Sequence, residues 1–198
     1  FQDKTIFTCF ALTEQSGGTG ADIHTTAVKD ENGDYILNGE KWLISHTDCS
    51  QFSYVICVTD PDKQGDDRLS AFFVPMDRPG FEIVPMPHMM GCRGSGHTGL
   101  KFTNVELEPE LMLGKRGEGM KVAMHSLAVS RVHIATSNLG ISQRMFEMSI
   151  ARARDRVTFG KPIIKRQAIK MKIANMQMMI HAPVSYTHLR AHETCADL

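Results

Sequence analysis

The hydrophobic pattern of this chain changes once, near Gly114, and that change decides which folds are open to it. Before Gly114, short runs rich in β-branched and aromatic residues alternate with turn residues, which is typical of strands. After it, bulky residues recur every seven positions at Leu127, Ile134 and Ile141, with small residues beside them. This spacing is typical of a helix that packs closely on another helix. The sequence therefore predicts an α+β chain of two domains, with a β domain before long antiparallel helices.

The β part has seven or eight expected strands, spaced as in a sandwich or barrel of roughly 100 residues. Residues 30–33, DENG, are turn formers and predict a hairpin between the runs on either side. Residues 53–59, SYVICVT, form an apolar run of the kind that is buried on both faces. The strands are expected at residues 9–13, 25–29, 35–38, 41–45, 53–59, 70–75, 81–86 and 100–107.

Two helices are expected in the second part, at about 118–155 and 165–181. Gly140 lies inside the first helix and should cost about 1 kcal/mol relative to alanine, so a close neighbour or a ligand is expected beside it. The expected domains are 1–113 for the β part and 114–183 for the helices. Residues 184–198 lose the helical period, and VSYTHLRAHET (184–194) resembles a translated sequencing adapter. We expect a non-native tail there, on a gene fragment truncated at both ends.

Composition argues against several function classes. The 22 basic residues balance the 22 acidic ones, which gives no electrostatic reason to expect nucleic acid or an anionic membrane as a partner. No apolar run reaches the roughly 20 residues of a membrane-spanning helix. The five cysteines form no CxxC pair, so free thiols are expected, and no metal site is expected.

The residues that can carry chemistry gather in three stretches. Residues 10–22, FALTEQSGGTGAD, read as a strand and a glycine-rich loop whose backbone amides can approach a ligand. Hydroxyls beside a strand, as at Thr13 and in KWLIS (41–45), suit the polar edge of a flavin ring, while Arg156 and Gln167 suit a pyrophosphate. Each stretch alone also fits an ordinary structural element. The sequence has no GxGxxG fingerprint, P-loop, HExxH or Ser-His-Asp spacing that points to another chemistry.

Together these stretches resemble the acyl-CoA dehydrogenase family. The similarity runs in collinear order from about Ile6 to Ala182, through FALTEQSGGTGAD, LNGEKWLIS, MGCRGS, KFTNVELEPE, GKRGEGMKVAM, SRVHIA and RVTFGKPIIKRQAI. It implies an N-terminal helical domain, a central β domain and a C-terminal four-helix bundle, with FAD bound between the β domain and the helices. The chain would then hold the β domain and the first two bundle helices, with the N-terminal helical domain missing.

The resemblance also implies site residues. Thr13 is expected to bond the pyrimidine edge of the flavin and Ser45 to keep a hydroxyl near its reactive nitrogen, while Leu43 stands where many members carry an aromatic ring. Residues of the helical part are expected to reach the FAD of a neighbouring subunit, which implies a homodimer or homotetramer. The implied FAD contacts are Phe10, Leu12, Thr13, Leu43, Ile44 and Ser45 in the β part, and Arg156, Thr158, Phe159 and Gln167 in the helical part.

The implied reaction removes a Cα proton from an acyl-CoA thioester with a carboxylate while hydride leaves Cβ for FAD, which gives the trans-2-enoyl product. No catalytic residue is expected in this chain. The base is a glutamate expected beyond Ala182, and Ser130 occupies the family's alternative position for it. Substrate contacts are implied at Ala21, Ser130 and Arg131. The loop TEQSGGTGAD is two residues longer than the family's common TEPGAGSD, and Ala21 stands where a serine often meets the substrate.

Two alternatives stay open on these residues: a flavin oxidase or monooxygenase on the same scaffold, and a non-catalytic module that binds FAD or acyl-CoA. The expected role is fatty acid β-oxidation, with an electron-transferring flavoprotein or a similar acceptor as partner. The expected compartment is the cytoplasm of a bacterium or the mitochondrial matrix of a eukaryote. This truncated chain by itself is expected to be inactive.

Overall fold

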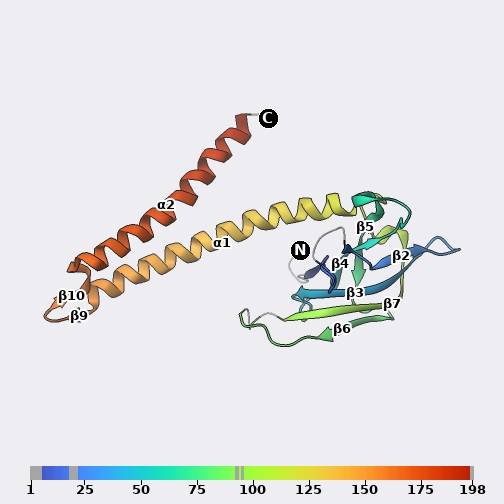
Figure 1. Ribbon diagram of the computed structural model, residues 1–198, viewed down its shortest axis with the longest axis horizontal. Coiled ribbons are helices and arrows are strands. Elements are labelled where there is room, and N and C mark those ends of the chain that lie inside the picture. Colours follow the sequence, from blue (N-terminus) through green and yellow to red (C-terminus); the bar gives the residue numbers. More distant parts are fainter. Residues whose placement is uncertain (1–5, 18–21, 92–93, 95, 197–198) are drawn as a thin grey trace. The chain divides into compact units, whose positions relative to one another are not determined.

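The computed structural model describes the backbone of residues 6–17, 22–91, 94 and 96–196, and the side chains of these residues as far as Pro183. Two compact units divide the chain, Phe1–Leu127 and Ala128–Leu198, and each is described by itself. The first unit carries a β-sheet, and the second is a helical hairpin (Figure 1). A β part therefore precedes a helical part, as the change of hydrophobic period predicts.

The first unit is built on an eight-stranded mixed sheet. Its order is β6-β7-β3-β2-β4-β5-β8, and β1 lies off this path, where it pairs in parallel with β4. Two short 3₁₀ turns, Gly65–Arg68 and Pro109–Leu111, connect strands. The strands are β1 (Thr8–Ala11), β2 (Thr26–Lys29), β3 (Tyr35–Ser45), β4 (Phe52–Val58), β5 (Leu69–Pro75), β6 (Phe81–Pro85), β7 (His97–Leu107) and β8 (Met112–Leu113).

Two clusters of buried side chains form the core of this unit. The larger cluster joins Phe72 of β5 to Val105 of β7, which lie toward opposite ends of the strand order, so the sheet curls around it. The smaller cluster joins Ile56 and Leu69 of β4 and β5 to Ala123, which belongs to the first helix. A curled sheet that encloses one core is the sandwich or barrel type of β domain that the sequence predicts.

The predicted hairpin is confirmed. β2 and β3 pair antiparallel, and Asp30 Oδ1 accepts hydrogen bonds of 2.9 Å from the backbone amides of residues 32–34. Residues 35–38 and 41–45 are not separate strands, as expected, but parts of the single strand β3. Gly39 does not break this strand; a side chain there would come within 2.7 Å of a neighbouring backbone segment, so glycine allows a close approach.

Two bulges interrupt the pairing of β3 with β7. The register shifts by one residue between positions 37 and 39 of β3, and again between positions 41 and 44. At the first shift the extra residue is on β7, where Asn104 has a φ of 50°; at the second it is on β3, where Leu43 has a φ of 58°. The bulge on β7 is the reason for the imperfect hydrophobic alternation of the last predicted strand.

The second unit is a helical hairpin. α1 (Gly119–Asp155) begins in the first unit and agrees with the predicted helix to within one residue at its start. A two-stranded ribbon, β9 (Val157–Thr158) and β10 (Lys161–Pro162), and the 3₁₀ turn Ile163–Lys165 lead into α2 (Gln167–Ala196). No helix in the described part of the chain is long and apolar enough to cross a membrane.

α2 extends beyond the expected end at residue 181 and contains Pro183. The proline removes one backbone donor. A helix adds one hydrogen bond for each residue that it gains, so a long helix can carry that loss. The interpretation of residues 184–198 as a non-native tail concerns their origin and stays a prediction.

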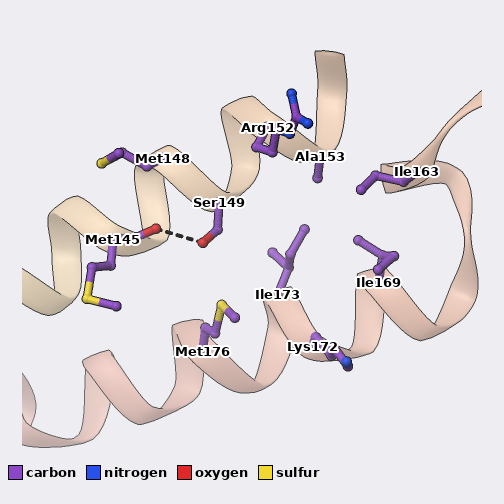
Figure 2. A pocket seen from close by; sticks show the side chains of 10 residues that line it. All are labelled: Met145, Met148, Ser149, Arg152, Ala153, Ile163, Ile169, Lys172, Ile173 and Met176. Carbon is purple, nitrogen blue, oxygen red and sulfur yellow. Dashed lines mark hydrogen bonds between the residues drawn. The ribbon is translucent and has the colours of Figure 1, made fainter. Parts of the chain in front are cut away.

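An apolar groove of about 440 Å³ lies between α1 and α2 near the ribbon (Figure 2). Ser149 lies on its α1 side, where the hydroxyl donates to the backbone carbonyl of Met145 at 2.7 Å. The bulky stripe of α1 stays largely uncovered in this chain, with Ile134 60% and Ile141 57% exposed. The lining residues are Met145, Met148, Ser149, Arg152, Ala153, Ile163, Ile169, Lys172, Ile173 and Met176.

Candidate functional site

The segment that follows β1 is bonded directly to the bulged end of β3. The backbone amide of Trp42 donates to the carbonyl oxygen of Thr13 at 2.8 Å. One residue earlier on each side, the Nζ of Lys41 donates to the carbonyl oxygen of Leu12 at 3.0 Å. The expected flavin contacts of the β part lie within residues 10–13 and 43–45. The two bonds therefore hold their segments side by side within the first unit.

Glu14 and Lys41 form a buried ion pair beside this link. The Nζ of Lys41 lies 2.9 Å from Oε1 of Glu14, with the side chains 0% and 6% exposed. Glu14 also accepts from the backbone amides of His24 and Thr25, at 2.8 and 3.0 Å. The carboxylate thus holds three donors from two different segments, and it clamps the start of the glycine-rich loop onto the sheet.

Burial and charge act against each other in this pair. Burial by itself raises the pKa of Glu14, but the charge of Lys41 and the hydrogen bonds from Thr25 and Lys41 outweigh it, and the pKa lies below its ordinary value. Burial lowers the pKa of Lys41, and Glu14 only partly restores it. In a buried pair of this kind, the free-energy cost of removing both charges from water offsets much of their attraction. The pair therefore contributes more to fixing the position of the two segments than to net stability.

The Leu43 bulge decides which way Ser45 faces. Along a regular strand, Ser45 would share the inward face with Lys41, which lies four residues earlier. The extra residue instead puts Ile44 into the core at 2% exposure, so Ser45 lies on the opposite, half-buried face. There, Ser45 Oγ lies 2.9 Å from His97 Nδ1 across the strand pair. Leu43 itself is 40% exposed.

Alternate residues of the segment 9–12, in β1 and directly after it, pack into the two core clusters. Cys9 and Ala11 belong to the larger cluster, whereas Phe10 and Leu12 pack against the smaller one and stay half-buried. The ring of Phe10 lies 5.1 Å from that of Tyr54, whose buried hydroxyl has no hydrogen-bond partner in the part of the chain that the structure describes. Burial raises the pKa of this hydroxyl to about 12.

The predicted contacts of the helical part lie in the second unit. Thr158 and Phe159 lie at the two-residue turn of the β9–β10 ribbon, Arg156 directly precedes β9, and Gln167 begins α2. The ring of Phe159 is 94% exposed. The stretch 152–172 holds eight basic residues and one acidic residue, which makes this end of the unit strongly basic.

The predicted substrate contacts lie in two distant parts of the sequence. Ser130 and Arg131 are exposed residues of α1. Ala21 lies outside the described residues, together with the preceding residues 18–20 of the glycine-rich loop. Within the described residues, no group of three His, Cys, Asp or Glu side chains could hold a metal ion.

Sequence reasoning missed four residues that build these sites: Glu14, Lys41, His97 and Arg166. Of these, Lys41 could have been found from the sequence. It lies an even number of residues after Tyr35 and Leu37, so it is expected on the same inward face of the strand, and a charge that is buried there needs a partner. No sequence pattern identifies the other three, because their partners lie in other segments or depend on a turn conformation.

Two family models match this chain. The model described as "Acyl-CoA dehydrogenase, middle domain" matches residues 9–105, and that described as "Acyl-CoA dehydrogenase, C-terminal domain" matches residues 117–195. The chain belongs to the acyl-CoA dehydrogenase family. The family and fold class implied by the resemblance are thereby confirmed.

Relatives and solved structures agree with this family. An acyl-CoA dehydrogenase of Bacillus subtilis is 40% identical over 190 residues, which cover 96% of this chain and 48% of the relative. The structure of butyryl-CoA dehydrogenase from Megasphaera elsdenii matches with a TM-score of 0.84 at 35% identity, over 89% of this chain and 46% of that one. An acyl-CoA dehydrogenase from Bacillus anthracis, solved in complex with FAD, matches with a TM-score of 0.79 at 30% identity, over 88% and 30%. The chain thus spans about half or less of the length of these acyl-CoA dehydrogenases.

The residues of the first unit fit a flavin. Phe10 and Leu12 offer half-buried apolar surface, and hydroxyls are offered by Thr13 and by Ser45, which lies three residues after the Trp42 that bonds Thr13. Tyr54 beside Phe10 adds a buried hydroxyl that has no partner among the described residues and that a ligand with polar ring atoms can satisfy. This combination of an apolar platform and a few polar groups is typical of a cofactor site.

Proposed function

We propose that this chain is part of an FAD-dependent acyl-CoA dehydrogenase, which in complete form oxidises an acyl-CoA thioester to its trans-2-enoyl product. The observation that supports this most is the hydrogen bond from Trp42 to Thr13, since it joins the two segments that match the family's flavin contacts. Bound FAD supplies the hydride acceptor. The residues of this chain bind it and orient it.

In this proposal the first unit holds the flavin ring. Thr13 donates its hydroxyl to the pyrimidine edge, while Phe10 and Leu12 exclude water from the ring face. Ser45 keeps its hydroxyl at the reactive nitrogen, on the face to which the bulge turns it. Leu43 covers less of the ring than an aromatic side chain would, because it is a smaller group.

The second unit completes the FAD site of another copy of the protein. Arg156 and Gln167 bind the pyrophosphate, and Thr158 and Phe159 reach the same cofactor. The high positive charge between residues 152 and 172 supports an anionic partner at this end of the helices. The complete enzyme is then at least a homodimer.

The proton-abstracting base comes from a part of the protein outside this chain. Ser130, which occupies the alternative family position, carries a hydroxyl and cannot act as a carboxylate base at neutral pH. Ser130 and Arg131, with Ala21, contact the acyl-CoA. Electrons pass to an electron-transferring flavoprotein or similar acceptor, in the bacterial cytoplasm or in a mitochondrial matrix. This chain alone has no turnover.

The test is to express the complete reading frame and to add acyl-CoA thioesters of graded chain length without oxygen. The wild-type protein should purify with FAD, and a matching thioester should bleach the flavin absorbance. Thr13→Val, which removes only the hydroxyl, should weaken FAD retention by roughly tenfold. Thr8→Val, an exposed change on the same segment, serves as the matched control and should retain FAD like wild type.

A complete protein that binds no FAD would rule out the flavoenzyme proposal. A protein that binds FAD but is reduced by no acyl-CoA would rule out the dehydrogenase reaction and leave the binding module. Rapid reoxidation of the reduced flavin by oxygen would favour the oxidase alternative.

A further inference from the structure

The tip of the β9–β10 ribbon has a conformation that its own residues do not favour. Thr158 pairs with Lys161, so Phe159 and Gly160 form the two-residue turn. Both have positive φ, 50° and 71°, as a type I′ turn requires. Glycine adopts such angles without strain, but phenylalanine does so at a cost. A ribbon with two residues in each strand is also too short to be stable by itself. Something else must hold this tip.

Arg166 contacts Thr158, which precedes the turn, and Phe159, the first residue of the turn. Its Nη2 donates to the carbonyl oxygen of Thr158 at 3.0 Å and also to the Thr158 hydroxyl oxygen. Its guanidinium carbon lies 5.3 Å from the centroid of the Phe159 ring, within the range of a cation–π contact. One side chain therefore fixes the backbone, the hydroxyl and the ring orientation of the tip.

These contacts also set the role of the Thr158 hydroxyl. Its oxygen accepts from Arg166, so its proton remains available to a different acceptor. The Phe159 ring stays 94% exposed despite its contact with the guanidinium. The tip thus presents one hydroxyl donor and one aromatic ring in a fixed arrangement, on a strongly basic end of the unit.

We propose that Arg166 is a positioning residue that shapes the Thr158–Phe159 tip before it meets the FAD of a second copy of the chain. This inference rests on the proposed function, in which those two residues reach the neighbouring cofactor. Arg166 acts through Thr158 and Phe159, because its Nη2 bonds the Thr158 carbonyl and hydroxyl and its guanidinium lies against the Phe159 ring. Its benefit is preorganisation, since a tip fixed in advance loses less conformational freedom when the ligand binds.

The test compares three substitutions in the complete FAD-containing enzyme and in the 198-residue chain. Arg166→Lys keeps the charge but loses the planar guanidinium that contacts Thr158 and Phe159, and Arg166→Gln loses both. Lys170→Gln removes the same charge one turn along α2, from an exposed side chain, and is the matched control. The readouts are the dissociation constant of FAD from the enzyme and the amide and ring NMR shifts of Thr158 and Phe159 in the chain.

If Arg166 positions the tip, both Arg166 variants shift the Thr158 and Phe159 resonances and weaken FAD binding by roughly tenfold, whereas Lys170→Gln changes neither. If Arg166→Lys binds FAD like wild type while Arg166→Gln and Lys170→Gln weaken it equally, charge alone matters and the positioning role is wrong. Unchanged FAD affinity in all three variants also overturns it. A wild-type enzyme without FAD would instead mean that the proposed function has failed. Circular dichroism of each variant separates these results from unfolding.

Discussion

The Nζ of Lys41 lies 2.9 Å from Oε1 of Glu14, and the two charges are withdrawn almost completely from water. Glu14 belongs to the segment before the glycine-rich loop, and Lys41 to the strand that carries Ser45. A buried ion pair is therefore the joint between the two segments that we assign to the flavin.

Removal of one partner should be costly. Lys41→Met leaves the buried Glu14 carboxylate without its countercharge and the carbonyl of Leu12 without its donor, so the free energy of unfolding should fall by about 3–5 kcal/mol. Trp42, the single tryptophan of the chain, provides a fluorescence signal for urea unfolding of this unit. Lys101→Met, at an exposed position of β7, is the control and should change it by less than about 0.5 kcal/mol. Equal losses for both variants would contradict a structural role for the pair.

The same pair should make the first unit sensitive to acid. The pKa of Glu14 is lower in the folded state than its ordinary value of 4.5, so the folded state holds the proton less tightly. The stabilisation is therefore complete above about pH 4.5 and is lost as the pH falls through the folded-state pKa. Urea unfolding followed between pH 7 and pH 3 should show this loss in the wild type and a smaller slope in Glu14→Gln. An identical slope in the variant would assign the acid sensitivity to other carboxyls.

The three cysteines of the first unit that the structure describes, Cys9, Cys49 and Cys57, should differ sharply in reactivity. Burial raises the pKa of the Cys57 thiol to about 12 and also raises that of Cys9, while Cys49 is exposed. Because the thiolate is the reactive form, iodoacetamide at pH 8 should label Cys49 and spare the other two until urea is added. Peptide mass spectrometry reads the three sites separately. Early labelling of Cys57 would show that β4 opens locally.

Two glycines of α1 should respond to alanine in opposite directions. A Cβ on Gly119 would lie 2.5 Å from the carbonyl carbon of Ser70, so Gly119→Ala should destabilise the first unit by about 1–3 kcal/mol. Gly140 has nothing within 4 Å of that position, so Gly140→Ala should stabilise the helix by about 0.4–1 kcal/mol. Urea unfolding followed by tryptophan fluorescence and circular dichroism measures both. A loss of stability in Gly140→Ala would point to a neighbour that a second copy supplies.

Local signals account for the elements that the sequence predicted well. The seven-residue spacing located α1 because helical periodicity accumulates over ten turns, and the DENG turn located the β2–β3 hairpin because its side chains bond their own backbone. The resemblance implies that Thr13 and residues 43–45 contact one ligand, whereas the hydrogen bond that joins their segments, from Trp42 to Thr13, appears only in the structure.

Other features depend on contacts between residues that are distant in the sequence, and the hydrophobic periodicity of a segment does not predict such contacts. The sequence predicts separate strands at 35–38 and 41–45, although Gly39 lies between them inside β3, where it allows a close backbone approach. The left-handed conformation of Leu43 is imposed by strand pairing, since leucine has no preference for it. In the sequence, nothing distinguishes Arg166 from the other basic residues around it. Its role depends on the turn that brings Thr158 within hydrogen-bond distance of its guanidinium.

The two bulges between β3 and β7 compensate each other. From position 37 to 44 on β3 and from 105 to 98 on β7 the chain advances by the same number of residues, so the displaced register between the bulges returns to its original alignment before Ser45 meets His97. Loss of one bulge residue alone would misalign that pair. Related sequences that vary in length at one bulge should therefore also vary at the other. Insertions or deletions in β3 and β7 are expected to occur together.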